Sequence, residues 1–268
     1  MSDAYIPYEQ IPEHLGIKKG DKIYLASDVL MISYIAKLHG ETFNPDKMLN
    51  AFIQQIGPAG TLLIPTFNFV FSNEGHYDIR NSECHVGALG NAALQREDFK
   101  RTFHPMHSFA VWGKDQEKLC SMKNDNSFGE DSPFTYMKEK GVRQIMLGTD
   151  YKRSMTFVHY VEYMVKVPYR FIKYFTGSYI NLDGAETEIT IPYYARDLSL
   201  GSEEHFNRLG KILEENGVSK KYDFNGVTVY VVELKESYGF IKKDIIENRC
   251  ANLYDFHVDR DLIWEQQK

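Results

Sequence analysis

Short apolar runs recur along the first 166 residues of the chain, separated by segments with a helical pattern of apolar and polar positions. Residues 22–26 (KIYLA) form such a run and are typical of a buried strand. Residues 61–65, 109–112 and 144–148 share this character. Strands that alternate with helices at this spacing predict an α/β fold, with a largely parallel sheet covered by helices.

The helices between these strands are predicted from residues that can cap them. Asn44, for example, is followed by Pro45, whose ring fits the first position of a helix. Four helices are expected, over residues 27–36, 44–57, 132–141 and 154–166, with Ser27, Asn44, Ser132 and Ser154 as their caps.

The pattern changes in the last third of the chain. Residues 179–182 and 186–191 flank Asp183-Gly184, a dipeptide typical of hairpin turns. A helix is expected around residues 203–216, and a strand near residues 227–232 closes the chain. No linker composition interrupts the sequence, so we expect one α/β unit with an antiparallel hairpin addition.

Composition and charge exclude several classes of protein. The chain has 31 Lys and Arg against 37 Asp and Glu, so it lacks the basic surface of a nucleic-acid binder. Its three cysteines are far apart and form no C-x-x-C pair, which argues against a disulfide framework and a cysteine zinc site. The first residues do not resemble a signal peptide, and Pro and Gly interrupt the longest uncharged stretch. We therefore expect a cytoplasmic protein without a membrane span.

The most informative segment runs from Ser154 to Glu162. On a helix, Thr156, His159 and Glu162 recur every three residues, on the face roughly opposite an apolar stripe. That face begins just after a strand, where open α/β sheets place their ligands. Glu162 could accept the ring N–H of His159 and leave the other nitrogen free to take a proton from a nucleophile. A solvated His–Glu pair has the same spacing, so spacing alone leaves both interpretations open.

His104 and His107 form a second candidate cluster, on a loop because Pro105 lies between them. With His159 and a carboxylate they could form a metal site, which would suit a metal-dependent hydrolase. Yet a loop does not hold both imidazoles on one face, and the chain has no H-E-x-x-H sequence. The alternative is a turn-capping histidine beside a surface histidine, and we expect no bound metal.

Taken in order, these segments resemble the aminoglycoside 3-N-acetyltransferase family, also called antibiotic N-acetyltransferases, which is unrelated to the GNAT acetyltransferases. The short match of residues 54–59 to the GNAT pattern Q-x-x-G-x-A follows a helix and leads into a strand, the reverse of its usual context. The resemblance is carried by residues 21–29, 60–66, 104–113, 128–133, 147–148 and 156–162.

The resemblance implies a three-layer α/β/α fold, not the GNAT fold, and a single antibiotic N-acetyltransferase-like domain over residues 1–268. It implies transfer of an acetyl group from acetyl-CoA to an amine of an amino sugar, either an aminoglycoside or a polysaccharide precursor, without a metal. His159 would be the general base and Glu162 would orient it, while Thr156 would position the thioester or stabilise its oxyanion. The residues expected to hold the pantetheine arm are Ser27, Asp28, Val29, Ser108 and Phe109.

The chain departs from the family at Asp28, where the family usually carries a second serine, so its cofactor contacts are expected to differ there. A third hypothesis, a non-catalytic carbohydrate-binding protein, rests on the 14% aromatic content. The acceptor amine and the oligomeric state stay open at this stage, with a homodimer among the alternatives.

Overall fold

A computed structural model describes residues 4–265. Its central sheet has seven strands in the order β10-β11-β6-β1-β2-β5-β4. Strand β1 pairs in parallel with β2 and β6. The four other pairs of neighbouring strands, β2–β5, β4–β5, β6–β11 and β10–β11, are antiparallel. The strands are β1 (Lys22–Ser27), β2 (Thr61–Pro65), β4 (Lys100–Arg101), β5 (Phe109–Gly113), β6 (Arg143–Leu147), β10 (Ser219–Phe224) and β11 (Val227–Glu233). The predicted α/β class is confirmed, with the parallel pairing confined to the three central strands.

Strand β5 runs antiparallel to β2, whereas its sequence pattern had suggested another parallel strand. Pro65, at the end of β2, pairs with Phe109, at the start of β5. The chain therefore leaves β2 and enters β5 at one edge of the sheet, and residues 66–108 form an excursion there that returns to the sheet only at the short edge strand β4. The excursion contains α4 (Val70–Glu74), β3 (His76–Asp78) and α5 (Ala88–Leu94). As a result, the carboxyl ends of β1, β2 and β6 meet the amino end of β5 at this edge.

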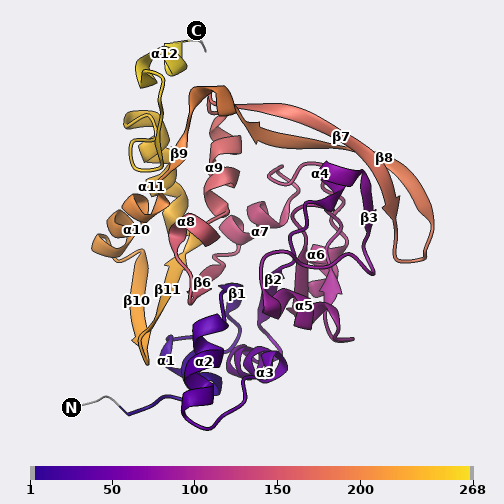
Figure 1. Ribbon diagram of the computed structural model, residues 1–268, viewed down its shortest axis with the longest axis vertical. Coiled ribbons are helices and arrows are strands. Elements are labelled where there is room, and N and C mark those ends of the chain that lie inside the picture. Colours follow the sequence, from indigo (N-terminus) through magenta and orange to yellow (C-terminus); the bar gives the residue numbers. More distant parts are fainter. Residues whose placement is uncertain (1–3, 266–268) are drawn as a thin grey trace.

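Helices cover both faces of the sheet, so the predicted three layers are confirmed. Along β1, Ile23 and Leu25 face one core, while Tyr24 and Ala26 face the other. The first core is closed by α1 (Ile11–His14), α2 (Leu30–Leu38), α3 (Pro45–Ile56) and α5. The second is closed by α7 (Pro133–Glu139), α9 (Phe157–Val165), α10 (Phe206–Glu215) and α11 (Leu234–Glu247). Figure 1 shows these two groups of helices on opposite sides of β1 and β6.

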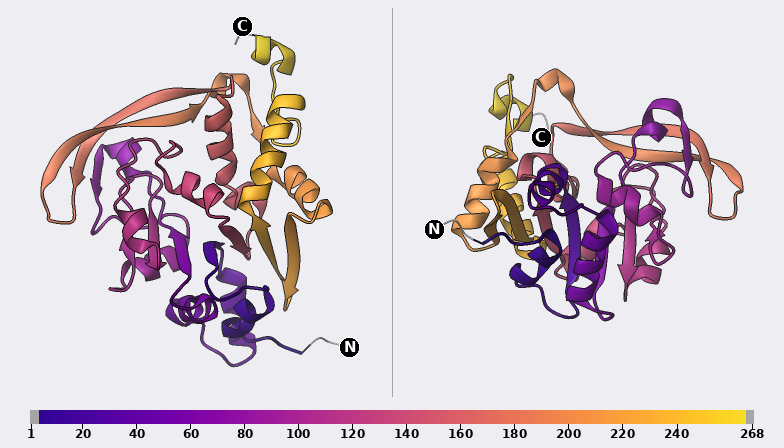
Figure 2. Two further views of the ribbon diagram at one scale, coloured as in Figure 1. Left: turned by 180° about the vertical axis from the view of Figure 1, so that it is seen from behind. Right: turned by 60° about the horizontal axis from the view of Figure 1, so that its bottom comes forward.

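The predicted hairpin is confirmed and is longer than expected. It consists of β7 (Arg170–Ile180) and β8 (Glu186–Arg196), which join β3 in a second, three-stranded sheet. The hairpin arches from the end of α9 over β3 and extends beyond the layered core (Figures 1 and 2). A small apolar cluster beneath it, which includes Tyr77, Met106 and Ile191, fixes it to the excursion. At its base, Arg170 and Tyr194 contact Glu162 of α9.

Two of the four predicted caps are confirmed. Asn44 Oδ1 accepts from the Asp46 amide at 2.8 Å, and Ser132 Oγ accepts from the Thr135 amide at 3.4 Å. Ser27 is instead the last residue of β1, and α2 begins three residues later. Ser154 ends α8 (Tyr151–Ser154), because Met155 leaves helical geometry before α9 begins.

The sequence pattern did not reveal α11, which follows β11 directly. The remaining elements are η1 (Tyr8–Gln10), α6 (Gln116–Cys120), η2 (Leu198–Leu200), β9 (Glu203–Glu204), β12 (Tyr254–Asp255) and α12 (Arg260–Glu265). Between residues 4 and 265, none of the helices has the length and apolar character needed to cross a membrane.

Candidate active site

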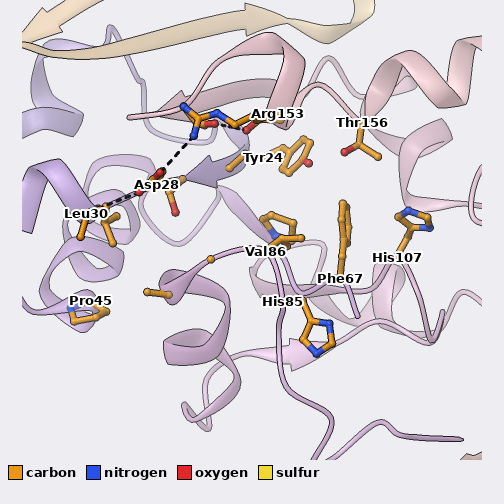
Figure 3. Close-up of a pocket in the computed structure, with 18 of the residues that line it drawn as sticks. Tyr24, Asp28, Leu30, Pro45, Phe67, His85, Val86, His107, Arg153 and Thr156 are labelled. Atoms are coloured by element: carbon orange, nitrogen blue, oxygen red, sulfur yellow. Dashed lines mark hydrogen bonds and ion pairs between the residues drawn. The ribbon is translucent and has the colours of Figure 1, made fainter. Parts of the chain in front are cut away.

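A cavity of about 960 Å³ opens at the edge where the central strands end. Figure 3 shows its lining, with Asp28 and Arg153 at one end and Thr156 and His107 at the other. Five segments supply the walls: the end of β1 (residues 26–29), the segment from α2 to the start of α3 (Leu30, Ser33, Phe43 and Pro45), the β2–β5 excursion, the segment from β6 into α9, and Tyr193 of β8. The antiparallel return of β5 and the hairpin thus complete a pocket that the parallel strands alone would leave open.

Ser27, Asp28 and Val29, three of the residues expected to bind the cofactor, line this cavity. Asp28 Oδ1 accepts from the Leu30 amide at 3.1 Å, and its Oδ2 lies 3.8 Å from Arg153 Nη1. Gly148 makes this loop conformation possible, because a Cβ atom there would lie 2.3 Å from the Asp28 carbonyl oxygen. The loop after β1 is therefore tightly packed against the loop after β6.

The structure does not bring Ser108 and Phe109 to the cavity. Ser108 is fully buried, where its Oγ donates to the Thr66 carbonyl and accepts from Arg101 Nε, both at 3.0 Å. Phe109 is fully buried as well, and its amide donates to Thr102 Oγ1 at 2.9 Å. Their side chains hold the excursion to the sheet and do not line the cavity, so a contact of this segment with the cofactor stays a prediction.

His159 and Glu162, by contrast, lie together as expected. His159 Nδ1 is 2.8 Å from Glu162 Oε2, and the His159 side chain lines the cavity with 22% of its surface exposed. Glu162 is completely buried. The pair is thus not a solvated one on a helix surface, because the hairpin and the C-terminal segment cover the face of α9 that carries Glu162.

Arg170, the first residue of β7, is a member of the site that the sequence analysis missed. Its Nε lies 2.8 Å from Glu162 Oε2, and Tyr169 donates to Glu162 Oε1 at 2.7 Å. Burial opposes ionisation of Glu162, but Arg170, then His159 and Tyr169, outweigh it and lower the Glu162 pKa to about 2. Glu162 is therefore a carboxylate at neutral pH. No periodicity links Arg170 to α9, since the chain turns between them.

Thr156 stands immediately before α9 and also lines the cavity. Tyr24, a fully buried residue of β1 whose pKa is raised by burial, lines the cavity as well. Thr156 and His159, two of the three residues predicted to be catalytic, thus reach the cavity itself, and Glu162 contacts it through His159.

His104 and His107 are both buried, and their rings are linked through the Ser127 hydroxyl rather than arranged as a metal site. His104 Nδ1 accepts from the amides of Met106 and His107, each at 3.1 Å, and its Nε2 lies 3.1 Å from Ser127 Oγ. Both of its ring nitrogens are engaged, and burial lowers its pKa to about 3. Within residues 4–265, no group of three His, Cys, Asp or Glu residues is arranged to hold a metal ion. The metal-dependent hydrolase hypothesis is not supported.

The aromatic wall of the cavity was not predicted from the sequence. Phe67, Phe69 and His85 come from the excursion, and Tyr193 comes from the hairpin. Phe67, Phe69 and His85 belong to loops, and Tyr193 belongs to a strand with alternating inward and outward side chains. In both settings the sequence around an aromatic residue looks the same whether the residue lines a cavity or fills the core.

The sequence of this chain matches a known protein family. The profile of the family described as "Aminoglycoside 3-N-acetyltransferase" matches residues 31–245. A curated relative from Bacillus subtilis (strain 168), the SPbeta prophage-derived aminoglycoside N(3')-acetyltransferase-like protein YokD, is 24% identical over 264 residues, which cover 89% of this chain and 91% of the relative.

Solved structures show the same fold at low sequence identity. Aminoglycoside acetyltransferase AAC(3)-Xa superposes with a TM-score of 0.77 at 21% identity and covers 92% of this chain and 94% of its own. AAC-IIIb, solved as a binary complex with CoASH, has a TM-score of 0.73 at 17% identity and covers 91% of this chain and 98% of its own. The prediction that the fold is not that of GNAT enzymes is thereby confirmed.

The family is one of acyltransferases, so the predicted enzyme class is confirmed, and acetyl-CoA fits as its co-substrate. The hypothesis of a non-catalytic carbohydrate-binding protein loses its support for the same reason. Since the profile matches most of the chain, this protein belongs to the aminoglycoside 3-N-acetyltransferase family.

Proposed function

We propose that this enzyme transfers an acetyl group from acetyl-CoA to an amine of an amino sugar, by direct attack of the amine on the thioester. The observation that carries the proposal is the ordered contact of His159, Glu162 and Arg170 beside a cavity of about 960 Å³. An imidazole held in this way faces the cavity while its partner carboxylate is shielded from water.

His159 is proposed as the general base. Its Nδ1 lies 2.8 Å from Glu162 Oε2 and 2.9 Å from Arg170 Nη2. A carboxylate only accepts hydrogen bonds, so it favours a proton on Nδ1, whereas a guanidinium only donates and favours a lone pair there. Donation to the carboxylate is the stronger interaction, so we assign the proton to Nδ1. The lone pair then resides on Nε2, which can take a proton from the attacking amine and so contribute about 10²–10⁴ in rate.

The loop after β1 is proposed to hold the pantetheine arm of the donor. Ser27 and Val29 line the cavity, and Thr156, close to His159 in sequence, is available to position the thioester. Arg153 offsets the charge of Asp28, which would otherwise repel an anionic cofactor. CoASH in the AAC-IIIb complex supports the choice of donor. Holding amine and thioester together converts a bimolecular step into one within a complex.

The proposed acceptor is a small amino sugar, either an aminoglycoside or a precursor of a polysaccharide. The names of the relatives favour an aminoglycoside. The aromatic wall of the cavity could stack against the apolar face of either kind of sugar ring. We further propose that the enzyme acts in the cytoplasm, where acetyl-CoA is available.

The test is CoA release from acetyl-CoA by the purified enzyme, with aminoglycosides and simple amino sugars offered separately. Amine-dependent CoA release, with an acetyl group added to the amine by mass spectrometry, is expected for at least one acceptor. No release with either class, together with no binding of CoA by calorimetry, would overturn the proposal.

A further inference from the structure

His107 occupies a fixed position at the end of the cavity that also carries Thr156 (Figure 3). The residue is 95% buried, and its ring lies edge-on to Phe67 at 4.9 Å between centroids and parallel to Tyr193 at 6.2 Å. Phe128 contacts both imidazoles of the site, with its centroid 5.2 Å from that of His107 and 6.1 Å from that of His159. His107 and His159 therefore flank the same part of the cavity.

A relay of hydrogen bonds determines which nitrogen of His107 carries its proton. His104 Nδ1 accepts from two backbone amides, which can only donate. The proton of neutral His104 is therefore on Nε2, and this nitrogen has no lone pair to offer to Ser127 Oγ, 3.1 Å away. The hydroxyl proton of Ser127 then has one acceptor left, His107 Nδ1, at 2.8 Å.

This assignment gives both ring nitrogens of His104, the Ser127 hydroxyl and His107 Nδ1 a hydrogen-bond partner. The reverse assignment, with a proton on His107 Nδ1, would leave the hydroxyl proton of the buried Ser127 without an acceptor, which is unfavourable. His107 thus carries its proton on Nε2. This N–H group has no hydrogen-bond partner among residues 4–265, although the side chain that bears it is almost fully buried and lines the cavity.

The same surroundings keep His107 uncharged. Burial, followed by the neighbouring His104, His159 and Arg170, lowers the pKa of His107 well below its usual range. A neutral N–H donor cannot lose or gain a proton easily at neutral pH. It can therefore stabilise charge on a ligand oxygen without competing with His159 for the proton of the amine.

On the basis of the proposed function, we propose that His107 is a further catalytic residue, whose Nε2–H donates a hydrogen bond to the acyl oxygen of the thioester. As the amine nitrogen bonds to the acyl carbon, the carbonyl electron pair moves to that oxygen and His159 takes a proton from nitrogen. When the carbonyl re-forms, the C–S bond breaks and the sulfur receives the proton from His159. His107 keeps its own proton throughout, and its hydrogen bond is strongest when the oxygen is negatively charged.

Two variants test the donor and the relay separately. His107→Ala removes the donor, and Ser127→Ala removes the hydroxyl that fixes the tautomer. Ser237→Ala is the matched control, because Ser237 is also a buried serine, in α11, and its hydroxyl donates to the Leu234 carbonyl three residues earlier. His107→Gln restores an N–H donor near the position of Nε2 and is the rescue variant.

For His107→Ala we expect kcat to fall about 10²–10³-fold, with the KM for the amine and the Kd for CoA close to wild type. His107→Gln should recover part of kcat, Ser127→Ala should lose less than His107→Ala, and Ser237→Ala should match the wild type. In ¹⁵N NMR spectra of the wild-type protein near neutral pH, His107 should show a protonated Nε2 and an unprotonated Nδ1.

A wild-type kcat in His107→Ala, a loss confined to the KM for the amine, or a proton on Nδ1 in the spectra would each overturn this inference while leaving the proposed function intact. If the wild-type enzyme transferred no acetyl group to any amine, the proposed function itself would fail, and this inference with it.

Discussion

Glu162 and Arg170 form an ion pair inside the protein, with 2.8 Å between Oε2 and Nε and with 0% and 6% of their side-chain surfaces exposed. The same carboxylate oxygen lies 2.8 Å from His159 Nδ1. The buried negative charge of Glu162 therefore interacts both with Arg170 of the hairpin, which stabilises the fold, and with His159 of α9, the proposed base. Substitutions at Glu162 should consequently affect both the stability of the fold and the activity of the enzyme.

The first prediction concerns stability. Glu162→Gln leaves Arg170 buried without a counter-ion, so we expect the free energy of unfolding to fall by about 3 kcal/mol, as for other broken buried pairs. Urea denaturation at neutral pH measures this loss.

Glu204→Gln is the control for this substitution. Glu204 contacts Arg196 at 2.7 Å, but the two side chains are 28% and 25% exposed. Because solvent screens such a pair, the cost should be at most about 1 kcal/mol. Equal losses at the two sites would show that the Glu162–Arg170 pair contributes no more than a surface ion pair.

The second prediction follows from the pKa of Glu162, which burial opposes but Arg170 and His159 lower from 4.5 to about 2. A lowered pKa in the folded state stabilises the protein above the unfolded-state pKa, and this contribution disappears as the pH falls through the folded-state value. The stability advantage of the wild type over Glu162→Gln should therefore shrink by about 1 kcal/mol per pH unit below about pH 4.5.

Urea denaturation of both proteins at several pH values between about 6 and 3 measures this change. An advantage that stays constant over this interval would mean that the carboxylate is not stabilised in the folded state.

The third prediction tests the loop that is proposed to hold the donor. Gly148 has φ of +69°, and a Cβ atom there would lie 2.3 Å from the Asp28 carbonyl oxygen. Gly148→Ala should therefore displace the Asp28 loop and weaken CoA binding, as measured by calorimetry. Gly141→Ala is the control, since Gly141 has φ of +60° but no atom within 4 Å of the added Cβ.

Both glycine variants bear the cost of a left-handed backbone, about 1–2 kcal/mol, but only Gly148→Ala adds the clash. If Gly141→Ala weakened CoA binding as much as Gly148→Ala, the effect would come from general destabilisation and the assigned role of the loop would be wrong.

The fourth prediction concerns metal chelation. Because both ring nitrogens of His104 are engaged in hydrogen bonds with the protein, it has no free lone pair for a metal. Prolonged treatment with a chelator should leave the rate of CoA release unchanged, and metal analysis of the untreated enzyme should find no stoichiometric zinc. Loss of activity on chelation, restored by added zinc, would contradict this assignment.

The sequence predicted the layered fold because local signals determine its central elements. The apolar runs of β1, β2 and β6 and the cap at Asn44 depend on neighbouring residues alone, so they could be recognised. The direction of β5 depends on the path of residues 66–108, which no local pattern records. For the same reason Ser27, although a good capping residue, ends a strand instead.

The site could be predicted only in part. His159 and Glu162 share one helix, so their spacing predicted their contact. Arg170 and Ser127 reach the site from separate segments, and their roles depend on tertiary packing that a helical or strand period does not describe. Ser108 lies in a family-like segment, and the contact of its hydroxyl with the Thr66 carbonyl also depends on tertiary packing that no local pattern records.

The most direct test of the proposed mechanism is the rate of acetyl transfer by His159→Ala, compared with the wild type and with His76→Ala, a variant of an exposed histidine on β3. The assigned role of His159 predicts that His159→Ala loses about 10²–10⁴ in kcat while CoA still binds, and that His76→Ala keeps the wild-type rate. Wild-type turnover by His159→Ala would contradict it.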